Sequence, residues 1–308
     1  MFQIAMEKGA AFEIFIAPAT GRNSVIRLIA GILLAVGIYI AFFFVMFTLA
    51  WLIDREAGIE WLGSALALST TPAAMSALFA TFLGMILGVF LTVRLVHRRG
   101  PRTLFGPNLR AFLKHFTIAL VVGMILFGLY ELFSLAFLDP VPRLSLATWL
   151  RWLPLGMLML LIQVTAEELT FRGYLVQQLA SRYASPLIWM LLPALLFGLA
   201  HYRQQEMGSN TWVFVLAATL IGLALTDLTR ITGDLGAAIG LHFVSNFWAI
   251  MVISAERGLS GFALYMTPLP PSDTGLMRGL ILMDVMVFLF AWLVLRRLLA
   301  RGAQNTTG

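Results

Sequence analysis

The sequence predicts an all-α, polytopic transmembrane helical bundle with about eight spans. Of its 308 residues, 60% are hydrophobic and only 12% are charged, and the mean hydropathy is +0.90. Soluble domains carry about 25% charged residues. The apolar residues form blocks of about 20, which is the length that crosses a bilayer as a helix. Basic residues gather between these blocks, as the positive-inside rule describes for membrane proteins.

Each apolar block is taken as one span, and the limits of the fifth to seventh are the least defined because these blocks are shorter or interrupted. The expected spans are 26–53, 72–96, 115–138, 149–176, 186–203, 211–230, 235–255 and 277–298. They form a single membrane domain over residues 25–301. We expect a cytoplasmic or interfacial segment at 1–24 and a disordered polar tail at 302–308.

The distribution of Lys and Arg predicts an integral membrane protein with its N and C termini in the cytoplasm. With that orientation and an even number of spans, most basic residues outside the spans lie on the cytoplasmic side, above all in the loop 98–114. The net charge of +6 belongs to these loops and not to a basic domain, so we expect a lipid bilayer and no nucleic acid as partner. The chain has no cysteine, which excludes disulfides and thiolate chemistry.

The fourth span contains two adjacent acids, Glu167 and Glu168, followed by Arg172. A charge inside a span costs about 2.5–3.5 kcal/mol, so each one calls for a structural or functional reason. Glu168 and Arg172 are four residues apart and can pair on one helix face. Glu167 points about 100° away and has no local partner. Glu168 and Arg172 are therefore interpreted as a supporting ion pair, and Glu167 as the acid that is free to act.

Two further spans carry histidines. His201 ends the fifth span, and His242 and Asn246 share one face of the seventh span because they are four residues apart. Taken singly, His201 is typical of an interfacial anchor, and the His242–Asn246 pair is typical of hydrogen bonding between helices.

Together these motifs resemble a known family. Glu-Glu-x-x-x-Arg, Phe-x-x-x-His and His-x-x-x-Asn occur in this order on three separate expected helices. This pattern is similar to that of the CPBP family of intramembrane proteases, which includes CAAX-prenyl endopeptidases and bacteriocin-processing or immunity proteins, also called Abi. The resemblance covers a core of about residues 145–255.

The resemblance implies an intramembrane endopeptidase that hydrolyses a peptide bond of a membrane-anchored peptide or protein. In this family pattern, Glu167 matches the catalytic glutamate that activates water, and Glu168 and Arg172 match the supporting pair. His201 matches the histidine that holds or activates this water. His242 and Asn246 match the residues that stabilise the oxyanion. Peptide hydrolysis needs such a base and such donors.

No metal is assigned from the sequence. If zinc is present, its ligands are Glu167, His201 and His242, a set of the His₂Glu type. The chain has no His-Glu-x-x-His helix, and a metal-free glutamate mechanism that uses the same residues is the preferred expectation.

Two alternatives stay open. One is a non-catalytic bacteriocin-immunity or membrane binding protein that keeps the site for docking. The other is an ion-coupled transporter, since buried Glu and His also mark ion pathways, although no inverted repeat is recognised. The oligomeric state is open, because Gly84-x-x-x-Gly88 and Gly236-x-x-x-Gly240 permit close helix packing within or between chains.

One expectation conflicts with the shared site. At 1.5 Å per residue, Glu167 and His242 lie about 10 Å from the cytoplasmic face, whereas His201 falls near the opposite end of its span. The three side chains meet only if the fifth span is tilted or displaced, for which Pro186 and Pro193 provide a reason.

Overall fold

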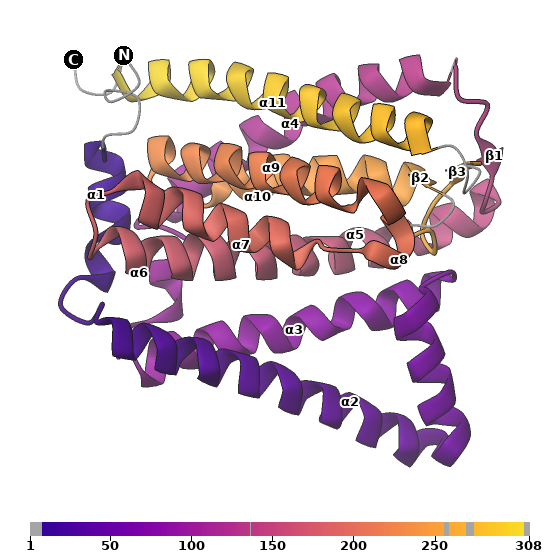
Figure 1. The fold of residues 1–308 in the computed structure, drawn as a ribbon, viewed down its shortest axis with the longest axis horizontal. Coiled ribbons are helices and arrows are strands. Elements are labelled where there is room, and N and C mark those ends of the chain that lie inside the picture. The colour runs from indigo at the N-terminus through magenta and orange to yellow at the C-terminus, as the bar shows by residue number, and fades with distance from the viewer. Residues whose placement is uncertain (1–7, 136, 256–258, 269–273, 305–308) are drawn as a thin grey trace.

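The computed structural model describes residues 8–135, 137–255, 259–268 and 274–304. Over these residues the chain is an all-α bundle of long, roughly antiparallel helices, which confirms the predicted fold class (Figure 1). Six helical segments are long and apolar enough to cross a membrane. The predicted fifth and seventh spans correspond to shorter apolar helical segments, 187–200 and 236–252.

The bounds of the helices follow the apolar blocks. The α-helices are α1 (Ala10–Ile16), α2 (Val25–Leu68), α3 (Pro72–Leu95), α4 (Leu109–Leu135), α5 (Leu146–Glu168), α6 (Gln177–Ala180), α7 (Leu192–Ala200), α8 (Gln204–Met207), α9 (Thr211–Thr232), α10 (Gly236–Asn246) and α11 (Thr274–Gln304). Three segments have π-helical geometry, η4 (Leu169–Val176), η5 (Leu187–Leu191) and η7 (Phe247–Val252), and three short ones are 3₁₀-helical, Ala17–Ala19, Pro101–Leu104 and Gly208–Asn210.

The helix α2 is two helices joined at a sharp bend. Asp54 and Arg55 have non-helical backbone angles, and the bend coincides with the expected end of the first span at residue 53. The part after the bend leads back to the start of α3 (Figure 1). Two adjacent charged residues at this point favour the aqueous edge of the bilayer over its interior, so the first span ends here.

Close approach of backbones holds the central helices together. A Cβ atom added at Gly240 of α10 would lie 2.6 Å from the carbonyl oxygen of Phe116 in α4. One added at Gly88 of α3 would lie 2.7 Å from the carbonyl oxygen of Ala35 in α2. Both glycine pairs noted in the sequence therefore serve helix contacts within the chain.

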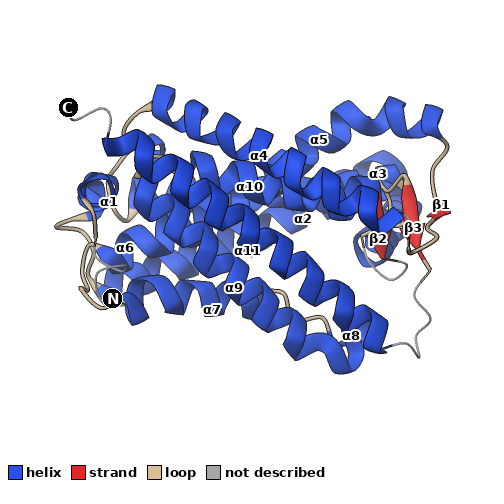
Figure 2. Ribbon diagram, turned by 90° about the horizontal axis from the view of Figure 1, so that it is seen from above, coloured by secondary structure: helices blue, strands red, loops and turns tan. Residues whose placement is uncertain are grey.

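A small three-stranded sheet lies at one end of the bundle (Figure 2). The apolar pattern of the sequence does not indicate these strands. Strand β3 (Tyr265–Thr267) pairs antiparallel with β1 (Val141–Pro142) and parallel with β2 (Ile253–Ala255). The expected seventh span, 235–255, therefore ends in a strand, because the chain leaves helical geometry at Ile253.

The opposite end of the bundle carries α1 and the end of α11 (Figure 1). Within the segment 1–24, which was expected to be cytoplasmic or interfacial, Phe12 and Phe15 of α1 are fully buried against the bundle. Of the expected tail 302–308, residues 302–304 are still helical and the remainder lies outside the described residues.

Candidate active site

The two acids of the fourth span lie where the helix changes geometry. Glu167 and Glu168 are the last residues of α5, and the π-helical segment η4 begins at the next residue. Such π-helical turns are frequent at functional sites because they re-aim side chains. Both acids are buried, with 8% and 0% of their surface exposed.

The predicted ion pair is present. Arg172 Nη1 donates to Glu168 Oε1 at 2.9 Å, and both side chains are almost completely buried. The guanidinium lies 4.3 Å from the centre of the Phe197 ring, and its Nη2 atom donates to the carbonyl oxygen of Gly222 at 3.4 Å. A cation held between a carboxylate and an aromatic face has little freedom, so the pair forms a rigid base for its neighbours.

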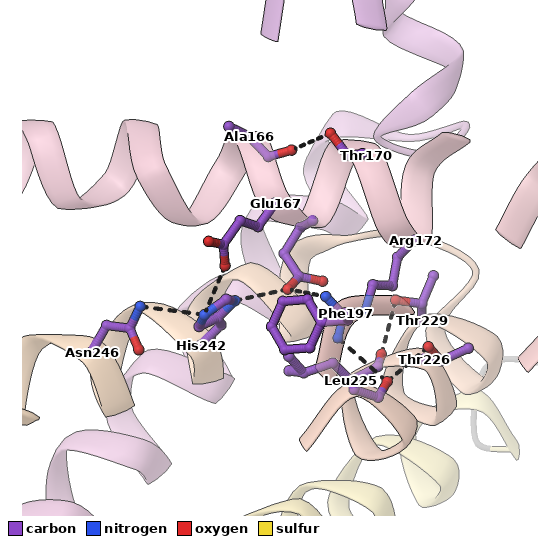
Figure 3. A network of polar contacts seen from close by, with 12 residues as sticks. Ala166, Glu167, Thr170, Arg172, Phe197, Leu225, Thr226, Thr229, His242 and Asn246 are labelled. Atoms are coloured by element: carbon purple, nitrogen blue, oxygen red, sulfur yellow. Dashed lines mark hydrogen bonds and ion pairs between the residues drawn. The ribbon is translucent and has the colours of Figure 1, made fainter. Parts of the chain in front are cut away.

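His242 lies between the two acids (Figure 3). Its Nδ1 atom is 2.8 Å from Glu168 Oε1, and its Nε2 atom is 3.6 Å from Glu167 Oε2. Because an ionised carboxylate only accepts hydrogen bonds, the proton of the ring is on Nδ1. The Nε2 atom then accepts from Asn246 Nδ2 at 3.3 Å. Glu168 thus contacts the histidine as well as Arg172, a role that the sequence did not indicate.

Gln163 is a site residue that sequence reasoning missed. Its Oε1 atom accepts from Asn246 Nδ2 at 3.1 Å, and only 6% of its surface is exposed. It precedes Glu167 by four residues, so both lie on the same face of α5. A lone amide in an otherwise apolar stretch, one turn before the acids, is the signal that was available.

His201 follows the last residue of α7 and caps it. Its Nδ1 atom is 2.8 Å from the carbonyl oxygen of Phe197, which accepts the bond, so the other ring nitrogen keeps a free lone pair. The ring centre is 4.6 Å from that of Phe197, whose own centre is 5.9 Å from that of His242. Phe197 therefore contacts both imidazoles.

A cavity of about 420 Å³ lies among the helices that carry the predicted site residues. Glu167, His201, His242 and Asn246 all line it. Glu168 and Arg172 are packed behind this wall and do not line the cavity. The Glu167 Oε2 atom is buried and makes no hydrogen bond with any described residue. The cavity is thus lined by an acid that has an oxygen without a hydrogen-bond partner among the described residues.

The conflict over the depth of His201 arose mainly from where the fourth span was expected to end, at residue 176. The α5 helix continues through η4 and α6 to Ala180, so Glu167 lies about 20 Å from that end. The next helical segment starts at Leu187, so His201 lies about as far from the same connection. The two residues therefore meet at equal depth without a tilted helix.

His242 reaches the same level because α10 begins inside the bundle. All residues from Gly236 to Val244 are buried, and the turn before them is covered by α1. A Cβ atom added at Gly233 in this turn would lie 2.5 Å from the carbonyl oxygen of Ala11.

The donor set does not fit a three-ligand zinc site. Among the residues that the structure describes, no group of three or more His, Cys, Asp or Glu side chains is arranged to hold a metal. One nitrogen of His242 contacts Glu168, and the other contacts Asn246.

Comparison with known proteins places the site within a known family pattern. Over 261 residues, which are 80% of this chain and 84% of the relative, the chain is 27% identical to "Uncharacterized protein YyaK" of Bacillus subtilis (strain 168). No solved structure gives a significant match. Residues 148–248, which include every residue predicted for the site, match the family "Type II CAAX prenyl endopeptidase Rce1-like", so the resemblance read from the three motifs is confirmed over this segment.

Proposed function

We propose that this protein is an intramembrane endopeptidase that hydrolyses a peptide bond of a membrane-anchored substrate, with Glu167 as the general base. One observation carries the proposal. Glu167 lines the cavity, and its Oε2 atom is buried and lacks a hydrogen-bond partner among the described residues. This atom lies 3.6 Å from His242 Nε2. This separation is too long for a direct hydrogen bond, so the carboxylate stays available to accept from a water molecule in the cavity.

In the proposed mechanism, that water is the nucleophile. Glu167 accepts one of its protons as it attacks the carbonyl carbon of the scissile bond. The nitrogen of His201 that faces away from Phe197 accepts from the other O–H of the water and orients it. Both groups line the same cavity, which supports this allocation.

Asn246 and His242 stabilise the oxyanion that forms. The Nδ2 group of Asn246 has two N–H bonds, directed at Gln163 and His242 in the absence of substrate. The substrate oxygen replaces one of these acceptors. When His242 is protonated on Nε2, it becomes a second donor, and the carboxylate of Glu168 on its Nδ1 side favours this cation.

The cycle closes without any other group. The proton held by Glu167 passes to the nitrogen of the leaving amine as the carbon–nitrogen bond breaks, and the tetrahedral intermediate yields a carboxylic acid and an amine. No step of this proposed mechanism uses a metal.

The test compares two glutamate variants of the full-length protein in liposomes. Glu167→Gln removes the proposed base and keeps the shape of the side chain. Glu13→Gln is the matched control, because it makes the same change at an exposed acid on α1. Cleavage of a panel of membrane-anchored peptides, one of them farnesylated in a C-terminal Cys-Ala-Ala-X sequence, is followed by mass spectrometry. We expect Glu167→Gln to lower the cleavage rate by about 10²- to 10⁴-fold, which is the usual contribution of a general base.

The Glu13→Gln protein should cleave at the wild-type rate, and both variants should keep the wild-type unfolding temperature. A Glu167→Gln protein that is folded and fully active would refute the proposed mechanism. Loss of activity on incubation with a zinc chelator, restored by zinc, would replace it with a metal-dependent one.

A further inference from the structure

A second polar group lines the same cavity on helices that carry none of the proposed catalytic residues. Tyr130 and Glu131 belong to α4, and Asp284 belongs to α11. The proposed mechanism uses none of them. Two carboxylates within apolar membrane helices are costly, so they require a compensating partner or a function.

The Glu131 carboxylate is buried without a partner. Only 8% of the residue is exposed, and neither of its oxygens forms a hydrogen bond or ion pair with a described residue. It lies close enough to Asp284 for their charges to interact. A buried acid that lines a cavity and makes no hydrogen bond or ion pair with a described residue is suited to a ligand that enters the cavity.

Asp284 lies where the cavity reaches the surface of the molecule. Its side chain is exposed although it also lines the cavity, so the cavity reaches the molecular surface beside α11. Tyr130 fixes one of its oxygens through a hydrogen bond of 2.8 Å from the phenol to Oδ1. Hence the carboxylate is held in place and accessible.

Among the residues that the structure describes, no unpaired arginine or lysine lines the cavity to neutralise these acids. Among the described lining residues, Arg203 is the one arginine or lysine, and its Nη1 atom pairs with Glu206 at 3.0 Å. We call Glu131 and Asp284 the acidic pair.

We propose that the acidic pair binds the side chain of a lysine or arginine of the substrate. The inference rests on the proposed function, because it assigns a specificity to the same cavity. Around the acidic pair the lining is apolar, with Leu78, Phe82 and Ile281 among its residues. A long aliphatic stem packs on such a wall while its charged end reaches the carboxylates.

A divalent cation is the less suitable occupant. Calcium takes six to eight oxygen ligands and magnesium takes six. The described residues provide no group of three or more acids or histidines at this place. An ammonium or guanidinium group, in contrast, is satisfied by two carboxylates and a phenol.

The helix register places the acidic pair at a definite distance from the scissile bond. The α4 and α10 helices run in the same direction, since Gly123 faces Val244 and Gly128 faces Trp248. Glu131 therefore lies about 8 Å further along the bundle than Asn246, towards the small sheet. An extended peptide covers about 3.3 Å per residue, so the basic residue is expected about two or three positions from the cleaved bond.

The test measures binding and does not depend on turnover. The protein carries Glu167→Gln so that the probe is not consumed, and it is compared with a variant that carries Glu131→Gln and Asp284→Asn in addition. The probes are fluorescent, N-palmitoylated octapeptides that differ only in having lysine or norleucine at one position, and affinity is read by fluorescence anisotropy in detergent micelles.

We expect the lysine peptide to bind at least about tenfold more tightly than the norleucine peptide at the best position, which corresponds to one charge-assisted contact. The additional substitutions should remove this preference and leave the affinity for the norleucine peptide unchanged, which also shows that the variant is folded.

Equal affinity for the two peptides at every position, or a preference that survives the substitutions, would overturn the inference. Displacement of the lysine peptide by calcium chloride, but not by sodium chloride of equal ionic strength, would assign the acidic pair to a metal ion instead. A failure of the proposed function is seen separately, as unaltered cleavage by the Glu167→Gln protein.

Discussion

The Nδ1 atom of His242 lies 2.8 Å from Oε1 of Glu168, although the two residues are 74 positions apart in the chain. The same carboxylate oxygen accepts from Arg172 at 2.9 Å. Glu168 thus joins a buried cation to the imidazole that lines the cavity. This single contact fixes the position of the ring proton and directs Nε2 towards Glu167 and Asn246.

Glu168 is expected to act as a positioning residue. Glu168→Gln removes the negative charge that favours protonated His242 and leaves an amide that also contacts the ring. We expect kcat to fall about 10- to 100-fold, the usual effect of losing a group that orients a catalytic histidine. The Michaelis constant should change little, because Glu168 does not line the cavity. Steady-state kinetics with the peptide panel checks this. A fall in kcat/KM that comes from a higher Michaelis constant alone, with kcat unchanged, would contradict it.

Arg172 is expected to matter for stability far more than a partly exposed arginine. Arg172→Leu leaves Glu168 as an unpaired buried charge, which typically costs about 3–5 kcal/mol. Arg203 pairs with Glu206 at the surface, with about a third of each side chain exposed, so Arg203→Ala should cost less than about 1 kcal/mol. Chemical unfolding in detergent measures both free energies. Similar values for the two variants would show that the buried pair is not the stronger contact.

Gly198 is expected to tolerate no larger residue. A Cβ atom at this position would collide with Thr219 Oγ1 and lie 2.6 Å from the carbonyl oxygen of Val215, so Gly198→Ala separates α7 from α9. We expect a loss of about 1–3 kcal/mol, typical of overpacking. Activity should also fall, because His201 caps the same helix.

The matched control is Gly37→Ala in α2, where an added Cβ atom meets nothing within 4 Å. It should be neutral or slightly stabilising, since alanine favours the helix by about 1 kcal/mol over glycine. Thermal unfolding and peptide cleavage on both variants provide the comparison, and a harmless Gly198→Ala would speak against close α7–α9 packing.

His97 is expected to make stability depend on pH. This residue follows α3, and burial, together with the charges of Arg99 and Arg27, lowers its pKa below the ordinary value of 6.5. Its ring accepts or donates hydrogen bonds with the Arg22 carbonyl and the Tyr174 phenol. Below pH 6.5 the unfolded chain therefore binds a proton that the folded chain resists, so stability is complete above this pH and decreases as the pH falls.

The measurement is the unfolding temperature of the wild type and of His97→Gln between pH of about 7.5 and about 5.5. The wild type should lose more stability on acidification than the variant. His115→Gln serves as the control for removing a histidine elsewhere, since His115 pairs with Asp234. An identical pH dependence in wild type and His97→Gln would contradict the prediction.

The sequence by itself determined what depends on local periodicity and composition. Blocks of apolar residues gave the fold class and, to within a few residues, most helix limits, because the bilayer sets the length of a span. The spacing of four residues placed Glu168 with Arg172, and His242 with Asn246, since such residues share a helix face. Both pairs are in contact in the structure.

The tertiary structure decided how far each helix lies along the bundle. His201 reaches the level of Glu167 because α5 continues to Ala180 and the following helix starts only at Leu187. Counting residues from the expected loops could not give the relative positions of His201 and Glu167. The position of a helix along the bundle depends on the segments that pack against its ends. The contacts of His242 with Glu168 and of Asn246 with Gln163 arise in the same way, from helices distant in sequence whose close-packed interfaces fix their relative register.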